Sequence, residues 1–404
     1  MRAYERFLDY VKIHTTSDDS TGQHPSTARQ FDLAHLLVKQ LKELGLADAR
    51  VDEQCYVYAT LPATPGCEDK PALGFISHMD TAPDASGENV KPQLHPDYDG
   101  GVIQLNDEVK LDPVLFPFMP ALKGQMLITT DGTTLLGGDD KAGVAEIMTA
   151  IEHIQNEKLP HGKLCIGFTP DEEIGEGADG FDVPGFGAQY AFTMDGGPVG
   201  EIEYQNFNAA GAMVICHGFS VHPGSAKNVM INAQNVAMEF HSMLPAADRP
   251  EHTDGTDGFF HLTSMVGDVT EAKLGYIVRD HDREKFEERK TMLRRITGYL
   301  NQKYGEGTVE LGLKDSYYNM EEKILPHFHL IENAIKAHKA IGVEPVIQPI
   351  RGGTDGARLS FEGLPCPNLG TGTYTMHGVC EFVSADQMDK CTQVILNLVA
   401  QYAE

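Results

Sequence analysis

The sequence predicts an α/β fold, in which helices cover a mostly parallel central sheet and a ferredoxin-like α+β domain is inserted. Over residues 1–204, apolar runs typical of buried strands alternate with segments whose apolar residues recur at helical spacing. Near residue 205 this alternation gives way to the order strand, helix, strand, strand, helix, strand. After residue 317 the first pattern returns. We therefore expect a first domain of 1–204 and 317–404 and an inserted domain of 205–316.

The first segments predict two helices and two strands. Residues 1–13 and 28–45 carry apolar residues at the spacing of an amphipathic helix. The runs VYATLPA and ALGFISHMD then favour strands. The second run is apolar on both faces, which is typical of an inner strand in a sheet covered by helices.

Residues 83–134 are rich in Pro, Gly and Asp and contain one strand candidate, MLITT, near their end. The run TLLGGDDKAGVAEIMTAIEHI then predicts a turn and a helix with a buried apolar stripe. KLCIGFTP and QYAFTMDGG follow as strands that end in acidic or glycine-rich turns. Strands alternating with helices in this way favour a mostly parallel sheet.

The inserted domain is predicted from six segments, and a helix at 328–341 then resumes the first domain. The six segments, alternating as stated above, are AAGAMVICHGFS, KNVMINAQNVAMEFHSML, FFHLTSMVGDV, AKLGYIVRD, REKFEERKTMLRRITGYLNQ and TVELGLKDS.

Composition excludes several classes of partner. Of 404 residues, 41% are hydrophobic and 23% charged, as in ordinary globular proteins, and the net charge is −27. Such a charge disfavours nucleic-acid backbones and anionic membranes, so we expect neither as a partner. The acids are spread along the chain, which favours an acidic soluble surface rather than an acidic tail.

Cysteine usage and the N-terminus predict a cytoplasmic protein. The seven cysteines are an odd number and form no CxxC pair, which argues against a disulfide framework or a thiolate zinc site. The N-terminus resembles an amphipathic helix rather than a signal peptide. No apolar run approaches the roughly 20 residues that a membrane-spanning helix needs.

The first chemical motif is His78 and Asp80 in FISHMDT. In an extended backbone, residues two apart point to the same side. An Asp at this spacing can accept the second ring N–H of a metal-binding His and so fix its tautomer. On its own, the pair is better explained as a capped strand end with a solvated Asp.

Two acidic motifs follow. In GGDDKAG, Asp139 or Asp140 either caps the helix or bridges two cations. In TPDEEIGEG, three consecutive acids either form a solvated turn, or one binds a cation while its neighbour moves protons.

Asp195 in FTMDGG and His377 in TYTMHGVCEF complete the set. Each is weak evidence alone. Together, four of the groups stand at or just after the carboxyl end of an apolar strand, where open α/β sheets bind their ligands. Carboxylates and imidazoles without thiolates suit zinc, cobalt or manganese in a hydrolytic site.

The order of these motifs resembles the co-catalytic zinc peptidases related to aminoacylase and bacterial carboxypeptidase G. Within that family the chain is most similar to the tripeptide aminopeptidases, through runs that span nearly its whole length. These runs include GFISHMDTAPD, LITTDGTTLLGGDDKAGVAEIMTA, FTPDEEIGEGA, VHPGSAK, DSYYNM and PIRGGTDGARLS. Departures from the family pattern occur at Gly138 and in GTYTMHG.

The resemblance implies two zinc ions per subunit, held by the first domain. It implies that His78 and Asp195 bind one ion and that Glu173 and His377 bind the other. Asp139 would bridge both, and it is preferred to Asp140 because the family's bridging Asp stands two residues before a Lys.

The resemblance also implies an activity, in which zinc-activated water attacks the first peptide bond of a tripeptide. Glu172 would be the general base, and Asp80 would orient His78. His222, Arg279 and Arg351 are candidates for substrate binding, although a turn residue and two salt bridges are simpler explanations. The inserted domain would serve as a lid or as the interface of a homodimer.

Two other kinds of function stay open from the sequence. One is a carboxypeptidase or an N-acyl amino acid amidohydrolase of the same family. The other is a non-catalytic peptide- or metal-binding module on the same fold, which would have no need of a carboxylate at Glu172.

Overall fold

The computed structural model describes all 404 residues, and the chain divides into two compact units. Unit 1 comprises Met1–Tyr204, Glu322–Gln348 and Thr354–Glu404. Unit 2 comprises Gln205–Glu321 and Pro349–Gly353, and so extends beyond the insert of 205–316 expected from the sequence. None of the helices combines the length and the apolar character needed to cross a membrane.

Unit 1 contains an eight-stranded mixed sheet. Its strands, in spatial order, are β1 (Arg50–Val51), β2 (Val57–Leu61), β8 (Leu164–Thr169), β3 (Leu73–His78), β9 (Tyr190–Gly196), β16 (Asn368–Gly370), β10 (Glu201–Glu203) and β15 (Val346–Ile347). The prediction of a mostly parallel sheet holds for the four central strands β8, β3, β9 and β16. It does not hold for β1 and β2, which pair antiparallel, or for the pairing of β10 with β16, whereas β10 and β15 are parallel.

Helices cover this sheet. They are α1 (Ala3–Tyr10), α2 (Gln30–Glu43), α3 (Gly138–Glu157), α4 (Val183–Phe186), α7 (Glu321–Ile324), α8 (His329–Ala340), α9 (Asp355–Phe361) and α10 (Ala385–Ala403). Helix α3 lies on β3 and β9, and α1 and α10 pack against α3. The strands β3 and β8 are buried along their whole length, as their continuous apolar runs predict.

A second, four-stranded sheet of unit 1 was not predicted as such. Its strands, in spatial order, are β17 (Thr373–Tyr374), β18 (Phe382–Ser384), β7 (Leu127–Thr129) and β4 (Gln93–His95). The hairpin of β5 (Ile103–Gln104) and β6 (Lys110–Leu111) lies in the same stretch of chain. Only β7 was expected, because strands of two or three residues carry no readable periodicity. This sheet matters for the site because His377 lies in the loop that joins β17 to β18.

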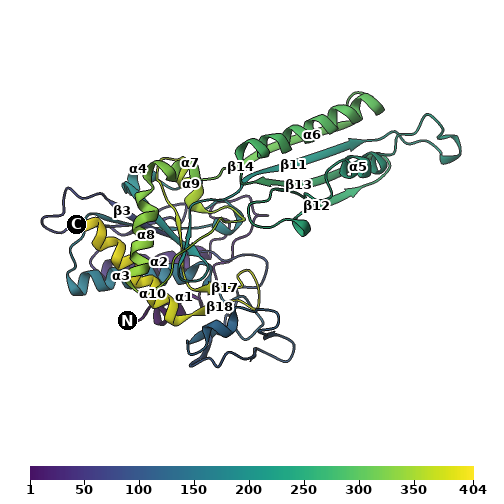
Figure 1. Ribbon diagram of the computed structural model, residues 1–404. Coiled ribbons are helices and arrows are strands. Elements are labelled where there is room, and N and C mark those ends of the chain that lie inside the picture. Colours follow the sequence, from purple (N-terminus) through teal and green to yellow (C-terminus); the bar gives the residue numbers. More distant parts are fainter. The chain divides into compact units, whose positions relative to one another are not determined.

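Unit 2 has the predicted order of elements. They are β11 (Asn208–His217), α5 (Ala233–Ser242), β12 (Phe259–Gly267), β13 (Glu271–Asp280), α6 (Arg283–Tyr304) and β14 (Val309–Tyr317). The strands form one antiparallel sheet in the order β12-β13-β11-β14, with α5 and α6 beside it in Figure 1. The predicted helix over 227–244 begins later, because the Asn232 side chain caps α5 by accepting the N–H of Gln234 at 2.9 Å.

Candidate metal centre

The carboxyl ends of three parallel strands bring the predicted site residues together. His78 is the last residue of β3 and lies opposite Thr169, the last residue of β8. The acidic turn Glu172–Ile174 follows β8, and Asp195 lies near the end of β9 on the other side of β3. These three segments share one edge of the sheet, as expected for neighbouring parallel strands.

His78 is buried and has a carboxylate on each side of its ring. Its Nε2 lies 2.9 Å from Asp139 Oδ1 and 3.4 Å from Asp195 Oδ1. Its Nδ1 lies 3.2 Å from the Asp80 carbonyl oxygen and 3.3 Å from Asp80 Oδ1. A proton on Nδ1 therefore has an acceptor in Asp80, which leaves Nε2 to face the acids.

Asp139 lies between the two histidines. Its Oδ2 is 3.3 Å from His377 Nε2, and the same nitrogen is 2.9 Å from Glu173 Oε2. The five predicted ligands are thus connected through contacts of 2.9 to 3.4 Å. Two groups of three have the spacing needed to hold a cation: His78, Asp139 and Glu173, and a second group that includes Asp140, namely His78, Asp140 and Asp195.

The adjacent acids Asp139 and Asp140 have different surroundings. Asp140 is buried, and its carboxylate accepts hydrogen bonds from the Ser77 hydroxyl, from the His78 N–H at 3.2 Å and from the Gly143 N–H at 3.2 Å. Its oxygens therefore tie β3 to the start of α3. The Asp139 carboxylate is instead directed at His78 and His377.

Asp80 also holds the acidic turn. Its carboxylate accepts the backbone N–H of Glu172 at 3.1 Å and that of Glu173 at 3.2 Å. Burial, reinforced by the charge of Asp195, raises the pKa of the Glu172 carboxyl well above its ordinary value. Burial and the charge of Asp139 raise the pKa of Glu173 to about 8. Close-packed carboxyl groups of this kind favour a bound cation or proton.

The carboxylates beside the two histidines raise the pKa of each ring. Hydrogen bonds with Asp139 and Glu173 raise the pKa of His377 to about 11. Burial alone would lower the pKa of His78, but the charges of Asp195 and Asp139 outweigh it and raise that pKa well above its ordinary value. Burial likewise opposes the ionised form of Asp139, yet the hydrogen bonds from His377 and His78 hold its pKa low.

The three candidate substrate residues all belong to unit 2. His222 is exposed, and its Nδ1 accepts the N–H of Gly224 at 3.1 Å, so it does form the turn that was its simpler explanation. Arg279 and Arg351 do not make the salt bridges considered for them. Arg279 Nη1 donates to the carbonyl oxygen of Arg351 at 2.9 Å, and Arg351 Nη1 donates to that of Gly255 at 2.6 Å.

Glu381 is a residue of this site that the sequence analysis did not single out. Its carboxylate is buried and accepts the backbone N–H groups of Leu136 and Gly137 at 2.8 Å and of Asp139 at 3.0 Å. It follows the His377 loop and so ties that loop to the segment that carries Asp139. The available signal was an acid directly before the apolar strand β18, four residues after His377.

Replacing Glu381 by Gln should weaken metal binding about tenfold, which is the lower end of the range for groups that orient metal ligands. The amide offers one acceptor where the carboxylate offers two, so one of the three N–H groups loses its partner. Chelator competition measures the affinity, with Glu157→Gln, on the exposed end of α3, as the control. An affinity equal to that of the wild type would show that Glu381 does not position Asp139.

Comparison with known proteins identifies one family by a sequence profile and by relatives that cover nearly the whole chain. Residues 131–401 match the sequence profile of "Peptidase family M20/M25/M40". Peptidase T of Alkaliphilus oremlandii is 54% identical over 404 residues, covering 99% of each chain. Peptidase T of one Clostridium perfringens strain is 55% identical and covers 100% of this chain and 99% of its own.

Solved structures share the fold. Aminopeptidase PepT from Bacillus cereus superposes with a TM-score of 0.80 at 22% identity, covering 100% of this chain and 98% of its own. The YXEP protein of Bacillus subtilis, described as a dinuclear metal binding peptidase from the M20 family, gives a TM-score of 0.65 at 16% identity. That match covers 99% of this chain and 98% of the other.

Proposed function

Because the chain belongs to peptidase family M20/M25/M40, we propose that it is a two-zinc aminopeptidase that releases the N-terminal residue from tripeptides. Membership makes it a hydrolase acting on peptide bonds. One observation carries the finer proposal: Asp139 lies between His78 and His377, with Glu173 and Asp195 beside them, at the carboxyl edge of the sheet. The peptidase T relatives and the family resemblance support the choice of tripeptides.

The donor set suits a pair of zinc ions. It contains two imidazole nitrogens and three carboxylates, with no thiolate, and such a set fits zinc in a hydrolytic site. His78 and Asp195 would hold one ion, Glu173 and His377 the other, and Asp139 would be shared. A shared anion offsets the repulsion between two cations, and Asp139 is the acid that has a histidine at each of its oxygens.

The chain's own residues would carry the proton and the orientation. Two bound zinc ions supply a water acidified toward neutral pH and a polarised scissile carbonyl. Glu172 would take the proton from the attacking water and pass it to the leaving amine. Asp80 would support both steps, since it contacts His78 Nδ1 and also accepts the Glu172 N–H.

Unit 2 would recognise the substrate. We take it to be a ferredoxin-like domain, a proposal supported by its order of elements and its β12-β13-β11-β14 sheet, and to act as a lid or dimerisation domain. Arg279 or Arg351 would read the peptide's carboxylate, and His222 would donate to the oxyanion. Two guanidinium groups that bond to backbone carbonyls, in a chain of net charge −27, support this assignment.

A cytoplasmic location is also part of the proposal. All seven cysteines are free and six of them are buried, so the fold is held together without disulfides. Such usage is typical of a reducing compartment.

Zinc binding should release protons, and the affinity should rise with pH between about 6 and 8. In the metal-free protein the pKa of His377 is raised to about 11, so its ring is protonated in this range, and the pKa of His78 is raised in the same direction. A zinc ion binds only the neutral ring. Calorimetry in buffers of different ionisation enthalpy counts the released protons, and a pH-independent affinity would contradict the ligand assignment.

The substrate class is tested with Ala-Ala-Ala, an N-blocked dipeptide and an acetyl amino acid. An aminopeptidase should release free alanine from the first substrate only. Cleavage of the blocked dipeptide would instead indicate a carboxypeptidase, and cleavage of the acetyl amino acid an amidohydrolase. Failure to cleave any of the three by the zinc-loaded protein would favour a binding module.

A further inference from the structure

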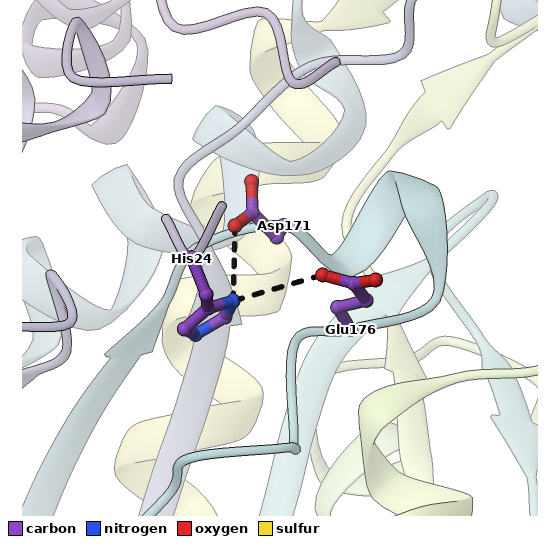
Figure 2. Close-up of side chains that lie close together, drawn as sticks. All are labelled: His24, Asp171 and Glu176. Carbon is purple, nitrogen blue, oxygen red and sulfur yellow. Dashed lines mark ion pairs between the residues drawn. The ribbon is translucent and has the colours of Figure 1, made fainter. Parts of the chain in front are cut away.

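Asp171 is the first of the three consecutive acids after β8, and the proposed mechanism leaves it without a role. It is fully buried and has a positive φ of 57°, a backbone conformation that is costly for a residue with a side chain. Figure 2 shows it facing His24, whose Nδ1 lies 3.1 Å from Asp171 Oδ2 and 3.9 Å from Glu176 Oε2.

The Asp171 carboxylate is supplied with donors from the N-terminal segment. Its Oδ2 accepts the Ser26 N–H at 2.6 Å, and its Oδ1 accepts the Ser26 hydroxyl and the Gln30 Nε2 group, the latter at 2.6 Å. Three hydrogen bonds therefore reach its two oxygens, and His24 Nδ1 lies beside them without making a fourth. A buried carboxylate supplied in this way is held in one orientation.

His24 fits this network better than it fits a cation site. The Tyr56 hydroxyl oxygen accepts the Gly180 N–H at 2.9 Å and lies 3.0 Å from His24 Nε2. The hydroxyl proton is then donated to Nε2, which assigns the ring proton to Nδ1, on the side of Asp171. A protonated Nδ1 is no ligand, and the oxygens of Asp171 are already engaged.

Gln30, the buried first residue of α2, makes two hydrogen bonds with Asp171. Its Oε1 accepts the Asp171 N–H at 3.2 Å, while its Nε2 donates to Oδ1. One side chain thus fixes both the backbone and the carboxylate of Asp171, which offsets the cost of the positive φ.

The orientation of Asp171 is passed on to its two neighbours. The Gly175 N–H is donated to the Glu172 carbonyl at 2.7 Å, and the Glu176 N–H to the Asp171 carbonyl at 3.0 Å, so the turn is closed on itself. From the other side, Asp80 accepts the N–H groups of Glu172 and Glu173. The turn is therefore held at both ends, with Asp171 directed toward the N-terminal segment.

We propose that Asp171, held by Gln30 and the segment 24–27, is a positioning residue that keeps the side chains of Glu172 and Glu173 directed toward the metal centre. The three adjacent carboxylates are tolerated because hydrogen-bond donors on one side of the turn stabilise the first, while the other two serve the site. This inference rests on the proposed function only for the role of Glu172. The fixing of the turn itself is independent of that role.

Introducing a negative charge at Gln30 tests whether its hydrogen bonds hold Asp171 in place. Gln30→Glu places a second carboxylate against Asp171 and should lower kcat about 10- to 100-fold, with KM changed less than about twofold. The double variant Gln30→Glu with Asp171→Asn restores a donor facing an acceptor, and should recover at least about tenfold of the lost kcat. Gln40→Glu on the same helix, where Gln40 bonds to Tyr10, is the matched control and should retain wild-type kcat.

Amide exchange of residues 171–176 gives a readout that does not depend on turnover. Gln30→Glu should speed exchange there and the double variant should slow it again. Wild-type exchange and wild-type kcat in Gln30→Glu would overturn the proposal. The proposal would also be overturned if Gln30→Glu, measured per folded and zinc-loaded molecule, had the kcat of the wild type. If Glu172→Gln proves fully active, the base assignment fails, whereas the exchange result still decides whether Asp171 fixes the turn.

Discussion

Replacing Glu172 by Gln should lower kcat by about 10²- to 10⁴-fold, the range that general acid–base catalysis contributes. The amide keeps the size of the side chain but cannot accept the proton of the attacking water. The hydrogen bond from the Glu172 N–H to Asp80 belongs to the backbone and is unaffected, so the turn should keep its place. Zinc content should therefore stay at the wild-type value, because Glu172 is not among the proposed ligands.

The control for this variant is Asp179→Asn. Asp179 lies seven positions after Glu172 in the sequence. It is exposed, and it forms an ion pair with Arg358. It should retain wild-type kcat. If Glu172→Gln keeps a tenth or more of the wild-type activity, Glu172 is not the base.

Replacing Asp139 by Asn should abolish activity and reduce zinc content from about two ions to one or fewer. Asp139 contacts both His78 and His377, so losing its charge weakens both proposed sites together. An effect larger than the 10- to 100-fold known for outer groups is expected, because Asp139 would touch the ions directly. Metal analysis after gel filtration, with turnover of Ala-Ala-Ala, measures both quantities.

The neighbouring acid provides a matched comparison. Asp140→Asn makes the same substitution one position along, where the carboxyl group accepts hydrogen bonds from the Ser77 hydroxyl, the His78 N–H and the Gly143 N–H. This variant should be less stable to heat but should still bind two zinc ions. If Asp140→Asn loses the metal and Asp139→Asn keeps it, the bridging role belongs to Asp140.

The sequence could predict the edge of the sheet at which the site forms. His78 and Asp195 stand at the ends of apolar runs, and the acid pair Glu172 and Glu173 follows another. Since parallel strands end at one edge, the three motifs were expected to meet, and β3, β8 and β9 are indeed parallel neighbours. These groups are far apart in the sequence, and their positions at the ends of apolar strands predicted that they would come together.

The sequence could not predict how His377 reaches this edge. Its loop joins β17 and β18, strands of two and three residues, and β18 pairs with β7 from a distant part of the chain. Such short strands carry no periodic signal, and their pairing is decided by tertiary packing. The same limit hid Glu381, whose three N–H partners lie more than 240 positions away in sequence.

The sequence pattern alone did not decide the choice within each acidic motif. Composition and spacing left Asp139 and Asp140 equivalent, and only the family resemblance favoured Asp139. The two carboxylates differ because one is directed at Ser77 and backbone N–H groups and the other at two histidines. For the three acids after β8, the turn of the chain at Asp171 separates one carboxylate from the other two.

Titration of the metal-free protein with zinc, assaying Ala-Ala-Ala hydrolysis at each step, tests the central claim most directly. A two-zinc aminopeptidase should reach full activity only as the second equivalent binds, with free alanine as a product. Full activity at a stoichiometry well below two, or in the presence of excess chelator, would contradict the two-zinc site.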